Sequence, residues 1–168
     1  MASTPQETVI SWLNDAYGLE NNLVQVLENH AKDAKDHPKI QAKIQEHLEK
    51  THHHADLVKN CIERLGGDTS SIKAGLSTIS GKLQGMSTGA SSDELVKNAL
   101  ADYASEQFEI ASYTSLISAA QSIGDQQTAQ VCQQILGDEQ DMANWLMQHI
   151  PTVTQEFLGT KAKARGAT

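Results

Sequence analysis

The chain has 168 residues, and its 13 Lys and Arg against 21 Asp and Glu give a formal net charge of −8. Hydrophobic residues make up 39% of the sequence and aromatic residues only 4%, so the core must be mainly aliphatic. This length and composition fit one globular domain. The acidic balance argues against a nucleic-acid or anionic membrane surface, because both favour clustered Lys and Arg.

Cysteine content and the N-terminal segment indicate the compartment. Cys61 and Cys132 are too few for a disulfide framework and lack the spacing of a zinc site. The sequence does not open with a charged segment followed by an apolar one. No apolar run approaches the roughly 18 residues that a bilayer span needs. These features predict a protein of the reducing cytoplasm.

Capping signals mark the first two predicted helices. The first helix begins at a capping box formed by Thr4 and Glu7 and runs to about His30. The second helix begins at Pro38, and its apolar residues keep helical spacing as far as Gly66. The short polar segment between the two predicts a helical hairpin.

The second half of the chain repeats this pattern after a long connection. Gly, Ser and Thr dominate residues 66–92, which predict a connection with one short, weakly amphipathic helix. A capping signal that includes Asp93 begins the third long helix, which ends at Gly124. Asp125 caps the fourth, which we expect to end at Pro151.

The order of these elements predicts the fold class. No segment shows sustained period-two alternation, so no strand is expected. Two helix pairs joined by one long crossing are typical of the ferritin-like arrangement, whereas a simple up-down bundle has three short loops. The sequence therefore predicts an all-α, ferritin-like four-helix bundle over residues 1–158, followed by a flexible C-terminal tail of residues 159–168.

Three of the four long helices carry a glutamate within the apolar stripe at mid-length. Glu20, Glu106 and Glu139 take these positions, and Glu109 is expected at the edge of the third stripe. A buried, unpaired carboxylate is costly or loses its charge. A glutamate in the apolar stripe of each of three helices indicates that their carboxylates bind one or two metal ions. Hard oxygen ligands suit iron or manganese. Alternatively, each glutamate lies at the core edge or is hydrogen-bonded by a tyrosine.

The second helix offers histidines. Glu49 and His52 match the Glu-x-x-His spacing of ferritin-like sites, but both point away from the apolar stripe. His47 and His54 stand two turns apart on or beside that stripe, and neutral imidazoles there can bind a metal. For each of them, a hydrogen-bonded histidine at the core edge is the alternative.

Motifs of all four long helices resemble, in matching order, the YciE/YciF family of ferritin-like bacterial stress proteins. The matching motifs are residues 15–20, 47–51, 106–113 (EQFEIASY), 138–146 and, as in YciE, 150–158. The resemblance implies a ferritin-like bundle that forms a homodimer, a carboxylate-bridged dinuclear iron site and a role in stress. Residue by residue, it supports Glu20, Glu106, Glu109 and Glu139 as ligands.

Two residues depart from that pattern. The family commonly has an acid at the position of Lys50, so this lysine would replace an anionic ligand with a cation. That exchange would remove one metal ion or abolish metal binding altogether. Met142 stands three residues after Glu139, where the fourth helix would offer a second ligand.

Two functions are compatible with these residues. The first is an oxidoreductase with at most two iron or manganese ions, which acts on dioxygen or peroxide in the manner of a ferroxidase. The second is a non-enzymatic, stress-induced dimeric bundle or interaction module with a degenerate or empty metal site, and Lys50 and Met142 favour it. The candidate metal ligands are Glu20, His47, His54, Glu106, Glu109 and Glu139.

Overall fold

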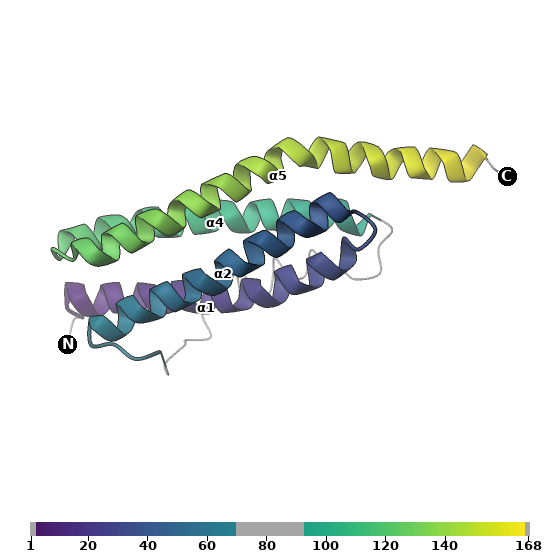
Figure 1. The fold of residues 1–168 in the computed structure, drawn as a ribbon. Coiled ribbons are helices and arrows are strands. Elements are labelled where there is room, and N and C mark those ends of the chain that lie inside the picture. Colours follow the sequence, from purple (N-terminus) through teal and green to yellow (C-terminus); the bar gives the residue numbers. More distant parts are fainter. Residues whose placement is uncertain (1–2, 70–92, 167–168) are drawn as a thin grey trace.

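The computed structural model describes residues 3–69 and 93–166, and four long α-helices account for most of them (Figure 1). The helices are α1 (Pro5–Asp33), α2 (Pro38–Arg64), α4 (Glu94–Ser122) and α5 (Gln126–Gly166). The described ranges contain no strand. The all-α four-helix architecture is therefore confirmed. The short helix expected in the connection falls on residues 70–92 and lies outside the described residues.

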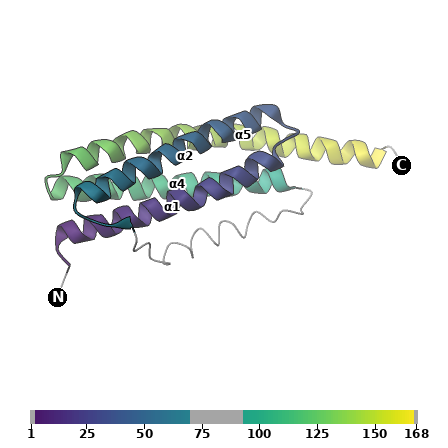
Figure 2. The ribbon, with the colours of Figure 1, turned by 60° about the horizontal axis from the view of Figure 1, so that its bottom comes forward.

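The helices form two antiparallel hairpins, α1 with α2 and α4 with α5. The hairpins meet where α1 packs on α4 and α2 packs on α5 (Figure 2). α2 ends and α4 begins at opposite ends of the bundle (Figure 1). The helix order thus matches the ferritin-like order predicted from the sequence.

Predicted capping residues fix most helix ends. The Thr4 hydroxyl accepts a hydrogen bond from the Glu7 backbone N–H at 3.2 Å, and Glu7 Oε2 accepts one from the Thr4 N–H at 2.7 Å. Gly66 and Gly124 follow α2 and α4 with φ of 80° and 77°, a conformation that glycine adopts without strain. The capping box and both glycine stops are confirmed.

Two helix ends differ from expectation. Asp93 stands at the N-cap of α4 but makes no side-chain capping bond. α5 does not end at Pro151 but continues to Gly166, beyond the ends of the other helices (Figure 1). Pro151 lacks the N–H that would bond the Met147 carbonyl. Both residues are exposed, so water can satisfy that carbonyl and the helix tolerates the proline.

Two apolar clusters flank a polar section in the middle of the bundle. The larger cluster draws on all four helices and includes Leu13, Ile62, Leu116 and Ile135. The smaller one comprises Leu27, Ala31, Ala34 and Ile44. Along α1, Glu20 lies between Leu13 and Leu27, so the glutamate sits where the two clusters leave a gap. No helix in the described ranges has an apolar stretch able to cross a membrane.

Candidate metal centre

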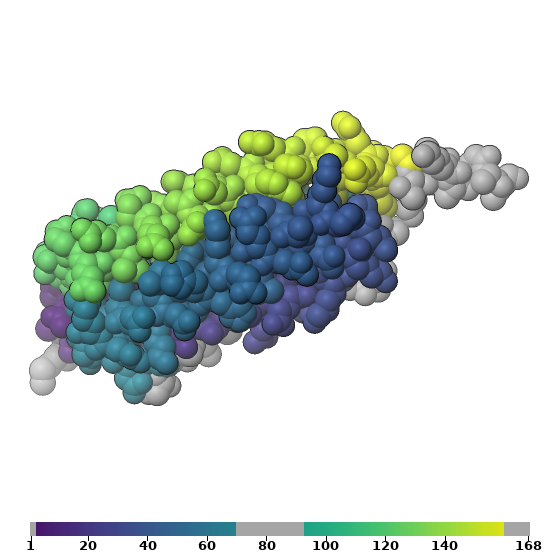
Figure 3. Space-filling view, viewed as in Figure 1, coloured from purple at the N-terminus to yellow at the C-terminus, as the bar shows by residue number. Residues whose placement is uncertain are grey.

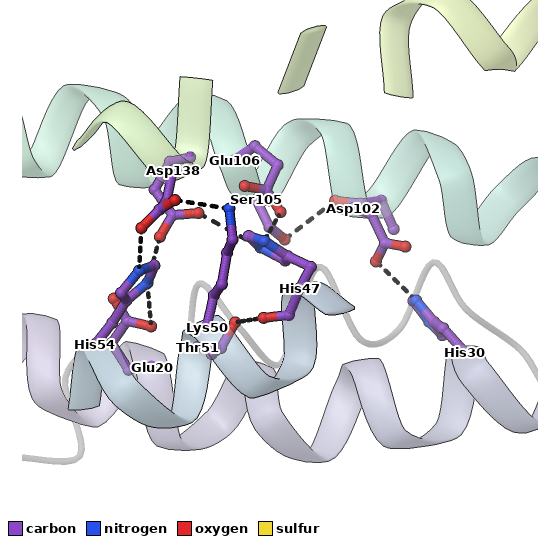
Figure 4. A network of polar contacts seen from close by, with 12 residues as sticks. Glu20, His30, His47, Lys50, Thr51, His54, Asp102, Ser105, Glu106 and Asp138 are labelled. Atoms are coloured by element: carbon purple, nitrogen blue, oxygen red, sulfur yellow. Dashed lines mark hydrogen bonds and ion pairs between the residues drawn. The ribbon is translucent and has the colours of Figure 1, made fainter. Parts of the chain in front are cut away.

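The six candidate ligands lie together at mid-length of the bundle, and each is 3% exposed or less. α1 contributes Glu20, α2 the two histidines, α4 two glutamates and α5 Glu139. Figure 4 shows Glu20, His47, His54 and Glu106 pointing toward the space between the helices. Residues from both hairpins therefore meet in one buried cluster.

Glu139 belongs to two groups of side chains, each with its ligand atoms within 4.8 Å of one another. In the first group, His54 Nδ1 lies 2.8 Å from Glu139 Oε1 and 3.9 Å from Glu20 Oε2. In the second, His47 Nε2 lies 3.1 Å from Glu106 Oε1 and 3.4 Å from Glu139 Oε2. The two oxygens of Glu139 thus face different groups, which is the geometry of a bridging carboxylate.

Many atoms of this cluster are buried without a hydrogen-bond partner. They are Glu20 Oε2, His54 Nδ1, Glu106 Oε2, Glu109 Oε1 and both carboxylate oxygens of Glu139. His54 Nδ1 and Glu139 Oε1 approach closely but lack the alignment of a hydrogen bond. An unsatisfied buried polar atom costs about 1–3 kcal/mol. Such a concentration fits side chains that converge on a shared cation.

Electrostatics support the same interpretation. Burial raises the pKa of Glu20 to about 8, and the nearby Glu139 carboxylate adds to this rise. Burial and Glu139 also raise the pKa of Glu106 and of Glu109 well above the ordinary range. Two divalent cations would offset four buried carboxylates charge for charge, so bound metal would remove the cost of ionising them.

The two histidines differ in their electrostatic surroundings. Burial lowers the pKa of His47, which favours the neutral imidazole that metal ligation requires. Burial also acts to lower the pKa of His54, but its contacts with Glu139, Glu20 and Asp138 outweigh this effect and raise the pKa. Both rings present one nitrogen to a group that contains Glu139.

Glu109 corrects one expectation. It is 1% exposed and so lies in the interior rather than at the edge of the apolar stripe. Ile110 and Ile117, which keep the helical spacing of apolar residues on this helix, are only half-buried. The buried line of α4 instead includes the polar residues Asn98, Asp102, Ser105, Glu106 and Glu109. Apolar spacing alone could not locate a buried face that is itself polar.

The residues predicted to face away from the core do so. Glu49 and His52 are exposed on α2, so the Glu-x-x-His spacing there takes no part in the cluster. Lys50 also lies outside both ligand groups, since its ammonium donates to Asp138 Oδ1 at 2.7 Å. Met142 is 1% exposed but carries no oxygen or nitrogen ligand.

Sequence reasoning missed two polar contacts around this centre. Asp138 Oδ2 lies 3.2 Å from His54 Nε2, and the only sequence signal for it was its place directly before Glu139. His30 and Asp102 form a buried pair between α1 and α4 with 2.7 Å between Nδ1 and Oδ1. Asp102 precedes Glu106 by one helical turn, a spacing that could have indicated the pair.

The family model described as "Domain of unknown function (DUF892)" matches residues 4–159. The chain belongs to the DUF892 family. A DUF892 match and a structural likeness to the stress protein YciF of E. coli bear out the resemblance to the YciE/YciF family. YciF is 21% identical, with a TM-score of 0.77 over 92% of this chain and 99% of its own.

Two further solved structures resemble this DUF892 protein, and one of them is a bacterioferritin. A protein from Xanthomonas campestris pv. campestris is 32% identical, with a TM-score of 0.81 over 95% of this chain and 99% of its own. A bacterioferritin from Desulfovibrio desulfuricans, described in different catalytic states of its diiron site, is 20% identical, with a TM-score of 0.74 over 95% of this chain and 91% of its own. The ferritin-like fold class is confirmed.

Proposed function

We propose that this DUF892 protein is a ferritin-like stress-response protein that holds up to two iron or manganese ions and acts on dioxygen or peroxide. The observation that carries the proposal is Glu139, whose two buried oxygens face two separate ligand groups. A carboxylate so placed would bridge two cations. The diiron site of the similar bacterioferritin supports the proposal by analogy of fold.

The residues present fit two ions. Glu20 and His54 would hold one, His47 and Glu106 the other, and Glu139 would be shared. Glu109 adds a fourth buried carboxylate beside them. Bound iron or manganese would supply the redox chemistry, such as ferroxidase-type oxidation or peroxide consumption.

The protein's own residues prepare this site. The Tyr113 hydroxyl donates a hydrogen bond to Glu20 Oε1, which leaves Oε2 directed toward His54. Burial lowers the pKa of His47 and so favours the neutral ring, which keeps one nitrogen lone pair for a metal. Because the ligands are 3% exposed or less, bulk water is kept away from the cluster.

A non-enzymatic role is the second candidate, and Met142 favours it. A methionine stands where Glu-x-x-His sites have a histidine, so one ligand would be missing. In this alternative, the bundle serves as a dimeric interaction module in stress, and the cluster is a weak or empty cation site.

Bound metal distinguishes the two candidates. We expect one to two irons per chain after anaerobic Fe(II) loading and desalting, followed by Fe(II) oxidation or peroxide loss when oxidant is added. Glu139→Gln keeps the shape of the side chain and should lose most of the bound iron, because both groups share this carboxylate. Glu49→Gln, on the exposed face of α2, is the matched control and should bind as the wild type does. A wild-type chain that retains no iron overturns the proposal.

The proposal also includes a cytoplasmic homodimer. The solution mass of the intact chain tests the oligomeric state, and a monomer or a large shell would contradict the dimer. Fractionation of cells that express the protein tests the compartment.

A further inference from the structure

The geometry points to Lys50 as a positioning residue for the metal centre: through Asp138 it holds His54 with Nδ1 facing the ligand group that contains Glu139. This inference rests on the proposed function. It assigns a role to Lys50, which the sequence marked only as differing from the acid common at this position in the family.

The three side chains form one continuous chain of contacts (Figure 4). Lys50 Nζ donates to Asp138 Oδ1 at 2.7 Å. The other oxygen of the same carboxylate, Oδ2, lies 3.2 Å from His54 Nε2. Lys50 and His54 are four residues apart on α2, so they share a face, and Asp138 reaches both from α5.

This arrangement selects one tautomer of His54. A carboxylate that already accepts a hydrogen bond from an ammonium offers its second oxygen as an acceptor only. His54 Nε2 must therefore carry the hydrogen in this contact. In the neutral ring the lone pair is then on Nδ1, the buried atom without a hydrogen-bond partner that lies 2.8 Å from Glu139 Oε1. A carboxylate behind the ligating histidine is a common way to orient the ring and raise its basicity.

Lys50 acts on Asp138 from the outer side of the cluster. The Lys50 side chain is 34% exposed and that of Asp138 is 26% exposed, whereas that of His54 is 1% exposed. The contact lies where α2 and α5 pack together, and Figure 3 shows the side chains of the two helices meeting along this face. The ammonium thus fixes the carboxylate without entering the ligand groups.

The test combines metal affinity with a signature of the histidine itself. Mn(II) binding to the full chain is followed by the loss of the free-ion EPR signal. The His54 tautomer is assigned by NMR of ¹⁵N-histidine-labelled, metal-free protein, at a pH high enough that the ring is neutral, because its neighbours raise the pKa of His54. Asp138→Asn should weaken Mn(II) binding by about 10- to 100-fold and remove the preference for hydrogen on Nε2. Lys50→Met keeps the aliphatic stem and should weaken binding by roughly two- to five-fold. Asp56→Asn, the same charge change on an exposed residue of α2, should alter neither measurement.

The outcomes separate this inference from the proposed function. If the wild type binds Mn(II) and both Asp138→Asn and Lys50→Met keep its affinity and its His54 tautomer, the positioning role is overturned. The metal centre itself is then unaffected. A wild-type chain that binds neither Mn(II) nor Fe(II) overturns the metal centre, and the NMR spectra of Lys50→Met and Asp138→Asn still decide how His54 is held. If Asp138→Glu binds Mn(II) more tightly than Asp138→Asn and regains hydrogen on His54 Nε2, the inference is supported.

Discussion

The hydroxyl of Tyr113 on α4 donates a hydrogen bond to Glu20 on α1, and both side chains are 1% exposed. The bond joins the two hairpins at the edge of the ligand cluster. It satisfies Glu20 Oε1 and leaves Oε2 without a hydrogen-bond partner. One tyrosine therefore serves both the packing of the bundle and the orientation of a candidate ligand.

Removal of this hydroxyl should reduce the stability of the metal-free protein. We expect Tyr113→Phe to lower the free energy of unfolding of the metal-free protein by about 1–3 kcal/mol, because a buried acceptor loses its donor. Urea denaturation measures the change. Tyr103→Phe, at a half-buried position of the same helix, is the control and should change stability less. Equal effects of the two substitutions would contradict the assigned role of the Tyr113 hydroxyl.

The raised pKa of Glu20 predicts how stability depends on pH. The pKa is about 8 in the folded chain against an ordinary value of 4.5, so the folded state holds a proton that the unfolded state releases in between. The protonated Glu20 carboxyl therefore adds to the free energy of unfolding in full below pH 4.5, and this stabilisation is lost as the pH rises through about 8. Each pKa unit corresponds to about 1.4 kcal/mol. The metal-free protein should therefore unfold more easily at pH 8 than at pH 5.

Chelator-treated protein in urea at the two pH values measures this difference. Glu20→Gln carries no titrating group and should reduce the difference, while Glu49→Gln on the exposed face of α2 should preserve it. The explanation fails if the wild type and Glu20→Gln lose the same free energy of unfolding between the two pH values.

Met142 offers a test of the incomplete Glu-x-x-His spacing. We expect Met142→His to tighten binding of Mn(II), because it adds an imidazole one helical turn after Glu139. Without metal, the buried ring should lower the free energy of unfolding by about 1–3 kcal/mol. Met142→Leu conserves volume and should cost less than about 1.5 kcal/mol with no gain in affinity. Calorimetric titration and urea denaturation give the two quantities, and an unchanged affinity in Met142→His would show that this position does not face the ions.

The start of α5 provides a test of capping away from the centre. Asp125 Oδ1 accepts a hydrogen bond from the Thr128 N–H at 3.2 Å, and Asp125→Ala should cost about 1 kcal/mol. Burial acts to raise the pKa of Asp125, but its bonds with Thr128 and Arg64 outweigh this effect and lower the pKa. The contribution is therefore present above the unfolded pKa and is lost as the pH falls below about 4.

Asp93 is the natural comparison, since it stands at the N-cap of α4 without a side-chain capping bond. Asp93→Ala should cost less than Asp125→Ala in urea denaturation at neutral pH. The same loss for both variants would mean that the Asp125 cap does not account for the effect.

Local signals were enough to predict much of the bundle. The capping box at Thr4 and the glycines at 66 and 124 act within one helical turn, so the residues concerned are neighbours in sequence. The helix end expected at Pro151 was wrong because an exposed proline can be tolerated by a helix whose freed carbonyl meets water.

The candidate ligands were also largely predictable, because a glutamate within an apolar stripe is visible in sequence. The polar buried face of α4 was not, since periodicity identifies a buried face only when that face is apolar. Glu109 was misplaced for this reason, and Asp102 was missed.

The sequence by itself determined four helices, their order and most of the candidate ligands that face the interior, although not Asp102 or the buried place of Glu109. Only the tertiary structure decided which of these meet: that Glu139 is shared by two groups, that Tyr113 holds Glu20, and that Lys50 bonds Asp138 rather than entering the cluster. The physical reason is the distance along the sequence over which each interaction acts. Capping and helical periodicity depend on residues a turn or two apart, whereas these contacts join side chains from different helices and depend on how the hairpins are rotated and aligned against each other.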